Sequence, residues 1–596
     1  MAGTEEARSM RNRVRPRRAG GPSSLDLRVL VIHSGADDPT SRAWLATLET
    51  WGVSYEAVIP AADRPLTVDQ LVHDERHGRF NAVVLTTDSS AFWPSLPALR
   101  EYRHRFGVRQ VNGFEYPRPV HGLQEVHGRP LDGHVGVLTP TGRRHLGYLV
   151  GEVPLDPGTF GYLSAVSDPG VFTSLVETRH HEPLVGIATA PDGLEDMVLT
   201  VNYSEAMLHW RLLARGAIDW VTRGCHLGMS RYHLSCHVDD VLLPNSKSRP
   251  GSAGAADGST VRMTADDVES TVAWQKEQGF TLDLAFNGYG AGPVAEDSLT
   301  AALVEHRHEF RWVNHTWSHV DMGTTVVEGR TRWRGVASLC EEIERNSSWA
   351  TAVGIPASST ALVTGCHSGL DNPHLDLALD RAGITAIATD SSRRPQGRAP
   401  GRATRVPRHP TNIFTHVTTW PELLREYRAH YPDVVPLPGT ESEFLEREER
   451  MVLSRVLSGD PGPLFAHQSN LADDRLLLRL LESCLGRYRA YLGPTAPLVN
   501  LSMDEIAAEL RRRAAWRGAR REHGMTATVD SRGRVVLASP VDVEIPLALP
   551  ADSVWAGGWP HRHPFGEPYA GTRSGWHRLP AGEVSRLIVP RRNLAW

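Results

Sequence analysis

The stretch Tyr232-His233-Leu234-Ser235-Cys236-His237-Val238-Asp239-Asp240 decides the fold and the chemistry that this chain can support. Residues 232–236 alternate as in a short strand, and two adjacent carboxylates follow near its end. Residues 310–314 lead in the same way into His315-Thr316-Trp317-Ser318-His319, and residues 463–466 lead into His467. Because α/β and barrel folds deliver the ends of their strands to one rim, we expect these polar groups to meet there.

The residue types in these motifs suit a catalytic metal site. One carboxylate and two imidazoles can hold a divalent ion and leave positions open for water and substrate, whereas a structural zinc site is normally closed by four protein ligands. The second carboxylate and the third imidazole are then free as general base and general acid. His315 and His319 are four residues apart, so one helical turn would place both rings on the same face. Together these groups suffice to hydrolyse an amide.

Each motif is weak by itself. The chain has 28 histidines, most of which are expected on the surface or in satisfied core positions. An Asp-Asp pair is often a turn or a helix cap. The ordered combination of all three motifs at strand ends is much harder to obtain by chance. The prediction of a catalytic metal site therefore rests on this combination.

The motif order resembles that of the NodB-like polysaccharide deacetylases. Their Thr-Phe-Asp-Asp motif corresponds to His237–Asp240, their His-Ser/Thr-x-x-His motif to His315–His319, and their Leu-x-His motif to Leu464–His467, which is longer by one residue. This superfamily resemblance covers about residues 230–520. Within the superfamily, the chain most resembles the large fungal galactosaminogalactan deacetylase and its bacterial relatives, in its long N-terminal domain, the stretch Pro407–Ile413 and a trailing β-rich segment.

The resemblance implies roles for individual residues. Asp240, His315 and His319 would bind a divalent metal, with zinc as the first candidate, while Asp239 would be the base and His467 the acid. Asp390 fits the position whose carboxylate orients the catalytic histidine. We find no arginine in the third motif to orient the base, because residues 364–369 take its place. Four further residues are predicted to contact the substrate: Asn287, Tyr289, His367 and Arg408.

The activity that the resemblance implies is removal of acetyl groups from an N-acetylated polysaccharide. The substrate would be a polymer of N-acetylhexosamine, either GalNAc or GlcNAc, and acetate would be released. Three alternatives stay open: a hydrolase of the same superfamily acting on another amide or ester, a catalytically inactive carbohydrate-binding protein, and a cytoplasmic scaffold that uses the arginine-rich N-terminal tail.

The amino-acid composition excludes few of these possible functions. With 596 residues the chain is expected to form two to four domains, and a hydrophobic content of 40% with 22% charged residues is ordinary for a soluble globular protein. A net charge of −5 does not indicate a nucleic-acid partner, and no stretch approaches the ~20 apolar residues of a membrane span. Residues 1–26 resemble a disordered basic tail without the apolar core of a secretory signal. That favours the cytoplasm, whereas the resemblance implies an extracellular polymer as substrate.

The five cysteines do not form the pattern of a disulfide scaffold. Cys236 and Cys366 lie inside the motifs and could face the site or the core. Buried apolar thiols are the expectation for all five.

The predicted fold class is α/β with several domains. Residues 27–224 read as a flavodoxin-like or amidotransferase-like α/β domain, with strands at 27–33, 53–59 and 81–86 and a helix at 41–51. This domain contains neither a cysteine nor a Gly-x-Gly-x-x-Gly motif, so a cysteine-dependent amidotransferase site and a dinucleotide site are not supported. The resemblance makes it a candidate carbohydrate-binding module.

The remaining chain divides into a barrel and a β-rich end. Residues 230–520 are predicted to form a distorted (β/α) barrel of seven or eight units, with a late strand at 497–501. Residues 244–259 are predicted to form a flexible loop. This loop either covers the site or is a solvent-exposed insertion. Residues 523–596 are predicted to form a small β-sandwich. Its Trp555, Trp559 and Trp576 suggest sugar stacking, although packing is the commoner role of tryptophan.

Overall fold

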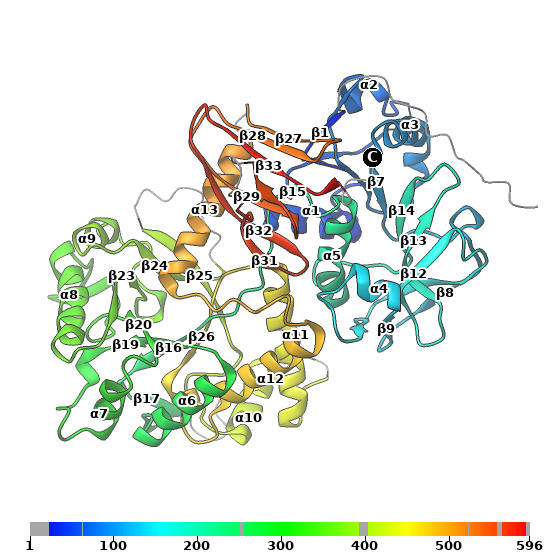
Figure 1. The fold of residues 1–596 in the computed structure, drawn as a ribbon. Coiled ribbons are helices and arrows are strands. Elements are labelled where there is room, and N and C mark those ends of the chain that lie inside the picture. Colours follow the sequence, from blue (N-terminus) through cyan, green and yellow to red (C-terminus); the bar gives the residue numbers. More distant parts are fainter. Residues whose placement is uncertain are drawn as a thin grey trace, which may run out of the picture.

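The computed structural model describes residues 23–61, 63–248, 256–392, 403–434, 436–521, 524–556 and 563–591. The basic N-terminal tail predicted at residues 1–26 therefore lies almost entirely outside the described residues. Figure 1 shows the barrel in green and yellow, the N-terminal sheet in blue and cyan, and the C-terminal strands in red between them.

The N-terminal α/β region is built on a nine-stranded sheet. Its spatial order is β10 (Val153–Pro154), β9 (Val135–Leu138), β12 (Phe172–Glu177), β13 (Pro183–Thr189), β14 (Glu195–Leu199), β7 (Arg109–Asn112), β6 (Ala82–Leu85), β2 (Val29–Ile32) and β3 (Tyr55–Val58). The helices of this region are α1 (Pro39–Trp51), α2 (Val68–Leu71), α3 (Leu96–Phe106), α4 (Pro140–His145) and α5 (Leu208–Val221), and β8 (Leu123–Pro130) pairs with β11 (Phe160–Val166).

Only part of this sheet follows the predicted doubly wound pattern. β14, β7, β6, β2 and β3 are parallel, and β2 is a fully buried apolar run, as such a strand requires. β9, β12, β13 and β14 pair antiparallel, and short turns connect β12 to β13 and β13 to β14. The sheet is therefore mixed.

The central region is a closed barrel of seven parallel strands. In order these are β16 (Cys236–Val241), β19 (Asp283–Phe286), β20 (Arg311–Asn314), β23 (Ala357–Leu362), β24 (Ala386–Asp390), β25 (Thr404–Pro410) and β26 (Leu464–His467). Its helices are α6 (Ala265–Gln278), α7 (Ser298–Glu305), α8 (Val336–Ala352), α9 (Leu375–Arg381), α10 (Trp420–His430), α11 (Glu441–Ser458), α12 (Leu476–Tyr491) and α13 (Met503–Arg521). Thr264 caps α6 with Asp267 in a capping box, and Gly279 ends the helix in the left-handed conformation. The predicted distorted (β/α) barrel is present.

Two strands of the barrel prediction were misplaced. The first barrel strand begins at Cys236 and contains both Asp239 and Asp240, rather than ending before them. Residues 232–234 are instead extended and hydrogen-bond with Val499, and residues 497–501 add no strand to the barrel. All five residues at 232–236 are buried, and Tyr232 packs against Tyr569.

Two hairpins leave the barrel. β17 (Asn245–Ser248) pairs with β18 (Ala256–Val261), and β21 (Thr324–Val327) pairs with β22 (Arg330–Trp333). The first hairpin overlaps residues 244–259, which the sequence predicts as a flexible loop, so that prediction is wrong for the two strands. Residues 249–255, between the arms, are outside the described part of the chain.

The C-terminal strands do not form a self-contained sandwich. β27 (Thr526–Asp530), β28 (Arg534–Ala538), β30 (Val554–Trp555) and β33 (Val584–Ile588) share one sheet with β1 (Ser24–Asp26), β5 (His77–Gly78) and β4 (Val72–Asp74). β29 (Val543–Pro550), β31 (Glu567–Tyr569) and β32 (Thr572–Leu579) share another sheet with β15 (His226–Leu227). The two ends of the chain thus share the seven-stranded sheet, a long-range pairing that no local pattern predicts.

The described tryptophans of this region are packed. Trp555 contacts Phe565 and His577, and the indole of Trp576 donates a hydrogen bond to Glu509. Trp559, the third tryptophan of the sugar-stacking suggestion, lies outside the described residues.

Candidate active site

The carboxyl ends of the barrel strands bring the three motifs together. Strand β16 pairs with β26 so that Asp239 is the register partner of His467. Nε2 of His315 lies 3.3 Å from Oδ1 of Asp240, and Nε2 of His319 lies 3.1 Å from the same oxygen. The predicted convergence of these five residues on one rim is therefore what the fold produces.

The two motif histidines meet through a loop and not through a helix. After β20 the chain turns with Thr316 at φ 66° and His319 at φ 58°, and the two imidazole rings stand edge to face with their centroids 4.9 Å apart. The helical turn expected from their spacing of four is thus wrong. Ser318 ties this loop to α8, because its backbone N–H and its hydroxyl both donate to the carboxylate of Glu342.

Left-handed backbone is concentrated at this rim. Asp240, Leu242, Thr316, His319, Cys366 and His367 all have positive φ, although none is glycine. Such conformations cost free energy for residues with a Cβ and persist where the surrounding fold imposes them, often at functional sites. The fold thus imposes strained backbone where it aims these side chains.

The donor set fits a divalent metal ion. Oδ1 of Asp240 and Nε2 of His315 are buried and make no hydrogen bond with any described residue, an arrangement that costs free energy unless something else binds them. Ligand atoms about 2.1 Å from one zinc ion lie about 3.4 Å apart at tetrahedral angles, close to the separations of 3.1 and 3.3 Å found here. Asp240, His315 and His319 could hold such an ion.

A set of neighbours fixes these three side chains. Nδ1 of His315 lies 3.0 Å from the carbonyl oxygen of Val363, which directs Nε2 toward Asp240. The amide of Asn245, on β17, donates to Oδ2 of Asp240 at 2.7 Å, and Gln468 donates in turn to Asn245. Asn245 and Gln468 were missed in the sequence, because nothing local distinguishes them from other polar residues.

Asp239 is held by an arginine from another strand. NH1 and NH2 of Arg408, on β25, donate to the two carboxylate oxygens of Asp239 at 2.7 and 2.8 Å. Arg408 was predicted to contact the substrate, but its side chain is only 1% exposed. Its contact with Asp239 is the one expected of a base-orienting arginine, and the sequence did not reveal it because Arg408 lies outside the third motif.

The third-motif segment supports this arginine. Nε2 of His367 lies 3.0 Å from Nε and 2.7 Å from NH2 of Arg408. Burial and the adjacent guanidinium lower the pKa of His367 to about 4, so the ring is neutral at pH 7 and can accept these hydrogen bonds. His367 thus supports Arg408, and its predicted contact with the substrate stays a prediction. Gly365 precedes it at a point where a Cβ would lie 3.0 Å from the His319 ring.

His467 has a different partner from the expected one. Its Nδ1 lies 3.2 Å from the hydroxyl of Thr415, whereas Asp390 accepts hydrogen bonds from the backbone and hydroxyl of Ser392. Asp390 was predicted to orient His467. Within the described residues the hydrogen bond at Nδ1 involves Thr415 instead.

Three further residues have distinct positions. Asn287 is fully buried and donates to the carbonyl oxygens of His315 and Thr316, so it supports the loop of His315 and His319 rather than facing a substrate. Tyr289 is 64% exposed beside Trp317, which is compatible with its predicted substrate contact. Cys366 is exposed on the rim, so the expectation of a buried thiol fails there and holds for the other four cysteines.

The two carboxylates are kept ionised by different neighbours. Burial alone would raise the pKa of Asp239, but Arg408 and His315 outweigh it and hold that pKa well below its usual range. Burial is likewise outweighed at Asp240, mainly by His315, and its pKa falls to about 2. Both groups are therefore anionic at neutral pH, a state that suits Asp239 to accept a proton and Asp240 to bind a cation.

The sequence comparisons find similarity to heparan sulfate N-deacetylases. Residues 255–418 match the family model of the heparan sulfate-N-deacetylase deacetylase domain. Human bifunctional heparan sulfate N-deacetylase/N-sulfotransferase 2 is 27% identical over 437 residues, which cover 67% of this chain and 44% of that protein. The human enzyme 1 of the same name is 25% identical over 318 residues, covering 49% and 32%. The chain thus spans less than half the length of these curated relatives.

The structural comparison extends over almost the whole chain. The crystal structure of Agd3, described as a novel carbohydrate deacetylase, superposes with a TM-score of 0.78 at 16% identity and covers 95% of this chain and 100% of Agd3. At this identity the likeness shows a common fold. Among the helices in the described residues, none is long and apolar enough to cross a membrane. In its fold and in its motifs the chain resembles the NodB-like carbohydrate deacetylases, as the order of those motifs indicated.

Proposed function

We propose that this protein is a metal-dependent polysaccharide N-deacetylase that hydrolyses the acetamido groups of an N-acetylhexosamine polymer. One observation carries the proposal: the Asp240–His315–His319 cluster lies beside an arginine-held carboxylate, Asp239, and beside His467. The curated relatives are named for removing N-acetyl groups from heparan sulfate, which supports a hexosamine polymer as substrate.

Different residues would carry out the separate steps of amide hydrolysis. Asp240, His315 and His319 would hold the metal ion, which would supply Lewis-acid chemistry to activate water and to polarise the acetyl carbonyl. Asp239 accepts the proton of the attacking water. Because Arg408 engages both carboxylate oxygens, Asp239 stays anionic and fixed in orientation, although it is a weak base.

The second proton transfer belongs to His467. The departing sugar amine is too basic to leave as an anion, so its nitrogen must gain a proton as the C–N bond breaks. Thr415 holds Nδ1 of His467, which leaves Nε2 to donate that proton. The products are acetate and a hexosamine with a free amine.

Acetate release from a panel of polymers tests this proposal. The panel contains N-acetylated heparosan, chitin oligosaccharides and a GalNAc polymer, each assayed with chelator-treated protein and after zinc is restored. Zinc-dependent acetate release from one of them is expected. Zinc-dependent release from O-acetylated xylan alone would favour the alternative of a related esterase, and no release from any substrate would favour an inactive carbohydrate-binding protein.

We also propose the region 27–224 as the carbohydrate-binding part of the chain. A cavity of about 550 Å³ opens at the ends of β6 and β7, lined by charged groups such as Glu115 and Arg118 and by Trp93, which is 58% exposed. Exposed aromatic faces beside polar side chains suit pyranose rings. Calorimetric titration of Trp93→Ala with oligosaccharides should show weakened binding with the acetate-release rate on short substrates unchanged. Equal affinity of the variant and the wild type would remove this assignment.

A further inference from the structure

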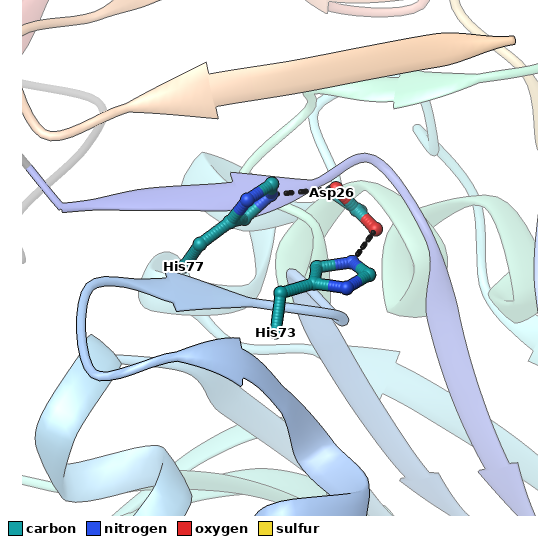
Figure 2. Close-up of side chains that lie close together, drawn as sticks. All are labelled: Asp26, His73 and His77. Carbon is teal, nitrogen blue, oxygen red and sulfur yellow. Dashed lines mark hydrogen bonds and ion pairs between the residues drawn. The ribbon is translucent and has the colours of Figure 1, made fainter.

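A second group of one aspartate and two histidines lies far from the barrel rim in the fold. It consists of Asp26 at the end of β1, His73 on β4 and His77 on β5, three strands of the sheet that the two ends of the chain share. Figure 2 shows both imidazoles turned toward the Asp26 carboxylate.

The register of the sheet explains this convergence. His77 pairs with Ser24 on β1, and Asp26 lies two residues further along the same strand and therefore on the same face. β4 pairs antiparallel with β5 and brings His73 alongside, with the two ring centroids 4.6 Å apart. Nε2 of His73 lies 2.9 Å from Oδ2 of Asp26, and Nε2 of His77 lies 2.8 Å from Oδ1.

We propose that Asp26, His73 and His77 form a second divalent-metal site, with zinc as the best-suited ion. Imidazole nitrogens and a carboxylate are ligands that zinc prefers, and the potential ligand atoms all lie within 4.8 Å of one another. The ion takes the place of the two hydrogen bonds, so each ring must move outward by about half an ångström to reach the ligand separations of a tetrahedral site. The histidine side chains are 47% and 30% exposed, which leaves them free to make this adjustment.

The surroundings permit an ion with open coordination positions. A cavity of about 390 Å³ adjoins the three side chains and gives room for water ligands. Arg28 and Arg79 also line it, but both form ion pairs with Glu56, at 3.6 and 3.0 Å, which offsets their repulsion of a cation.

Such an ion would link strands that come from distant parts of the chain. The β4–β5 hairpin is at the edge of its sheet and pairs with β1 through only two residues, while β1 pairs on its other side with the C-terminal strand β27. A metal bound by ligands from all three strands would stabilise the β4–β5 edge of the sheet. Because a ligand that binds only the folded state stabilises it, zinc should raise the unfolding temperature of the protein.

Zinc stoichiometry in a background without the barrel site tests the inference. The full-length His315→Ala/His319→Ala variant, equilibrated with buffered micromolar free zinc, should retain one equivalent by elemental analysis. Adding His73→Gln/His77→Gln should remove that equivalent, and Asp26→Asn should weaken zinc binding at least tenfold. The exposed pair His180→Gln/His181→Gln is the matched control, because His181 contacts a single carboxylate, Glu177, and zinc content should not change.

The outcomes separate this inference from the proposed function. Absence of zinc in the His315→Ala/His319→Ala background, or zinc that persists after both His73→Gln/His77→Gln and Asp26→Asn, would show that these residues form only a hydrogen-bonded cluster. That result would leave the deacetylase proposal intact. In the wild-type protein, anomalous scattering at the zinc edge should give two peaks, one at the barrel rim and one at Asp26. A single peak at the rim would overturn the inference.

Discussion

The same three ligand types occur at two places in this protein, in opposite surroundings. At the barrel rim the side chains of His315, Asp240 and His319 are 1%, 9% and 27% exposed, whereas those of Asp26, His77 and His73 are 19%, 30% and 47% exposed. Nδ1 of His315 is fixed by a carbonyl and Asp240 by Asn245. Within the described residues, no hydrogen bond fixes Nδ1 of His73 or of His77.

The two sites also differ in the groups beside the proposed ligands. At the rim, Asp239 and His467 lie next to them, whereas within the described residues the Asp26 site has the Asp74 carboxylate near its two histidines and no third imidazole among its lining residues. Burial at the rim also strengthens electrostatic interactions that water would weaken at the exposed site. We therefore expect chemistry at the rim and only binding at Asp26, and variants matched between the two sites test that contrast.

The largest difference in acetate release is expected when the proposed metal ligands of the two sites are substituted. His315→Ala/His319→Ala should abolish acetate release and remove the rim metal, because one carboxylate cannot hold the ion alone. His73→Gln/His77→Gln should leave the rate of acetate release unchanged. Metal analysis and acetate assays on the same preparations check both statements, and full rim metal content in the first variant would contradict the ligand assignment.

The next effect separates the adjacent carboxylates. Asp239→Asn cannot accept a proton, so turnover should fall by roughly 10²–10⁴-fold while the rim metal stays bound, the usual contribution of a general base. Asp240→Asn should lose metal and activity together, because a neutral amide is a poor ligand. Steady-state rates with metal content distinguish these outcomes. Near wild-type turnover by metal-loaded Asp239→Asn would refute the proposed base.

A third contrast concerns the two arginine–carboxylate pairs. Arg408→Met leaves Asp239 as a buried, unpaired charge, so the free energy of unfolding should fall by about 3–5 kcal/mol. Arg79→Met breaks a partly exposed pair with Glu56 beside the Asp26 site and should cost about 1 kcal/mol or less. Urea denaturation of both variants measures the difference, and equal losses would mean that burial does not set the strength of these pairs.

The smallest effect is expected from the support of the rim ligands. Asn245→Ala removes the hydrogen bond to Oδ2 of Asp240 and should weaken zinc binding at the rim by roughly 10–100-fold, as is usual for residues that orient metal ligands. Competition with a chromophoric chelator measures this change. Ser246→Ala, a neighbouring exposed position on the same strand, is the control and should bind zinc as the wild type does. Unchanged affinity in Asn245→Ala would show that the ligands need no such support.

Local patterns were sufficient to predict much of the barrel. Short apolar runs ending in polar residues located β19, β20 and β26 within a few residues, since a strand end at a barrel rim needs that change of polarity. They failed at residues 232–236, because an extended segment packed at the base of the barrel has the same alternation as a strand. They also failed between His315 and His319, where a spacing of four arises from left-handed turns.

The sequence by itself determined which ligands, base and acid are available, because these depend on residue type and on position at strand ends. Only the tertiary structure decided that Arg408 holds Asp239, 169 residues away, and that Thr415 contacts His467. The same is true of β1, whose partner β27 comes from the other end of the chain, and of Asp26, which meets His73 and His77 across that shared sheet. The physical reason is that strand register, not proximity along the chain, sets which side chains meet, and register is fixed only when all the strands pack together.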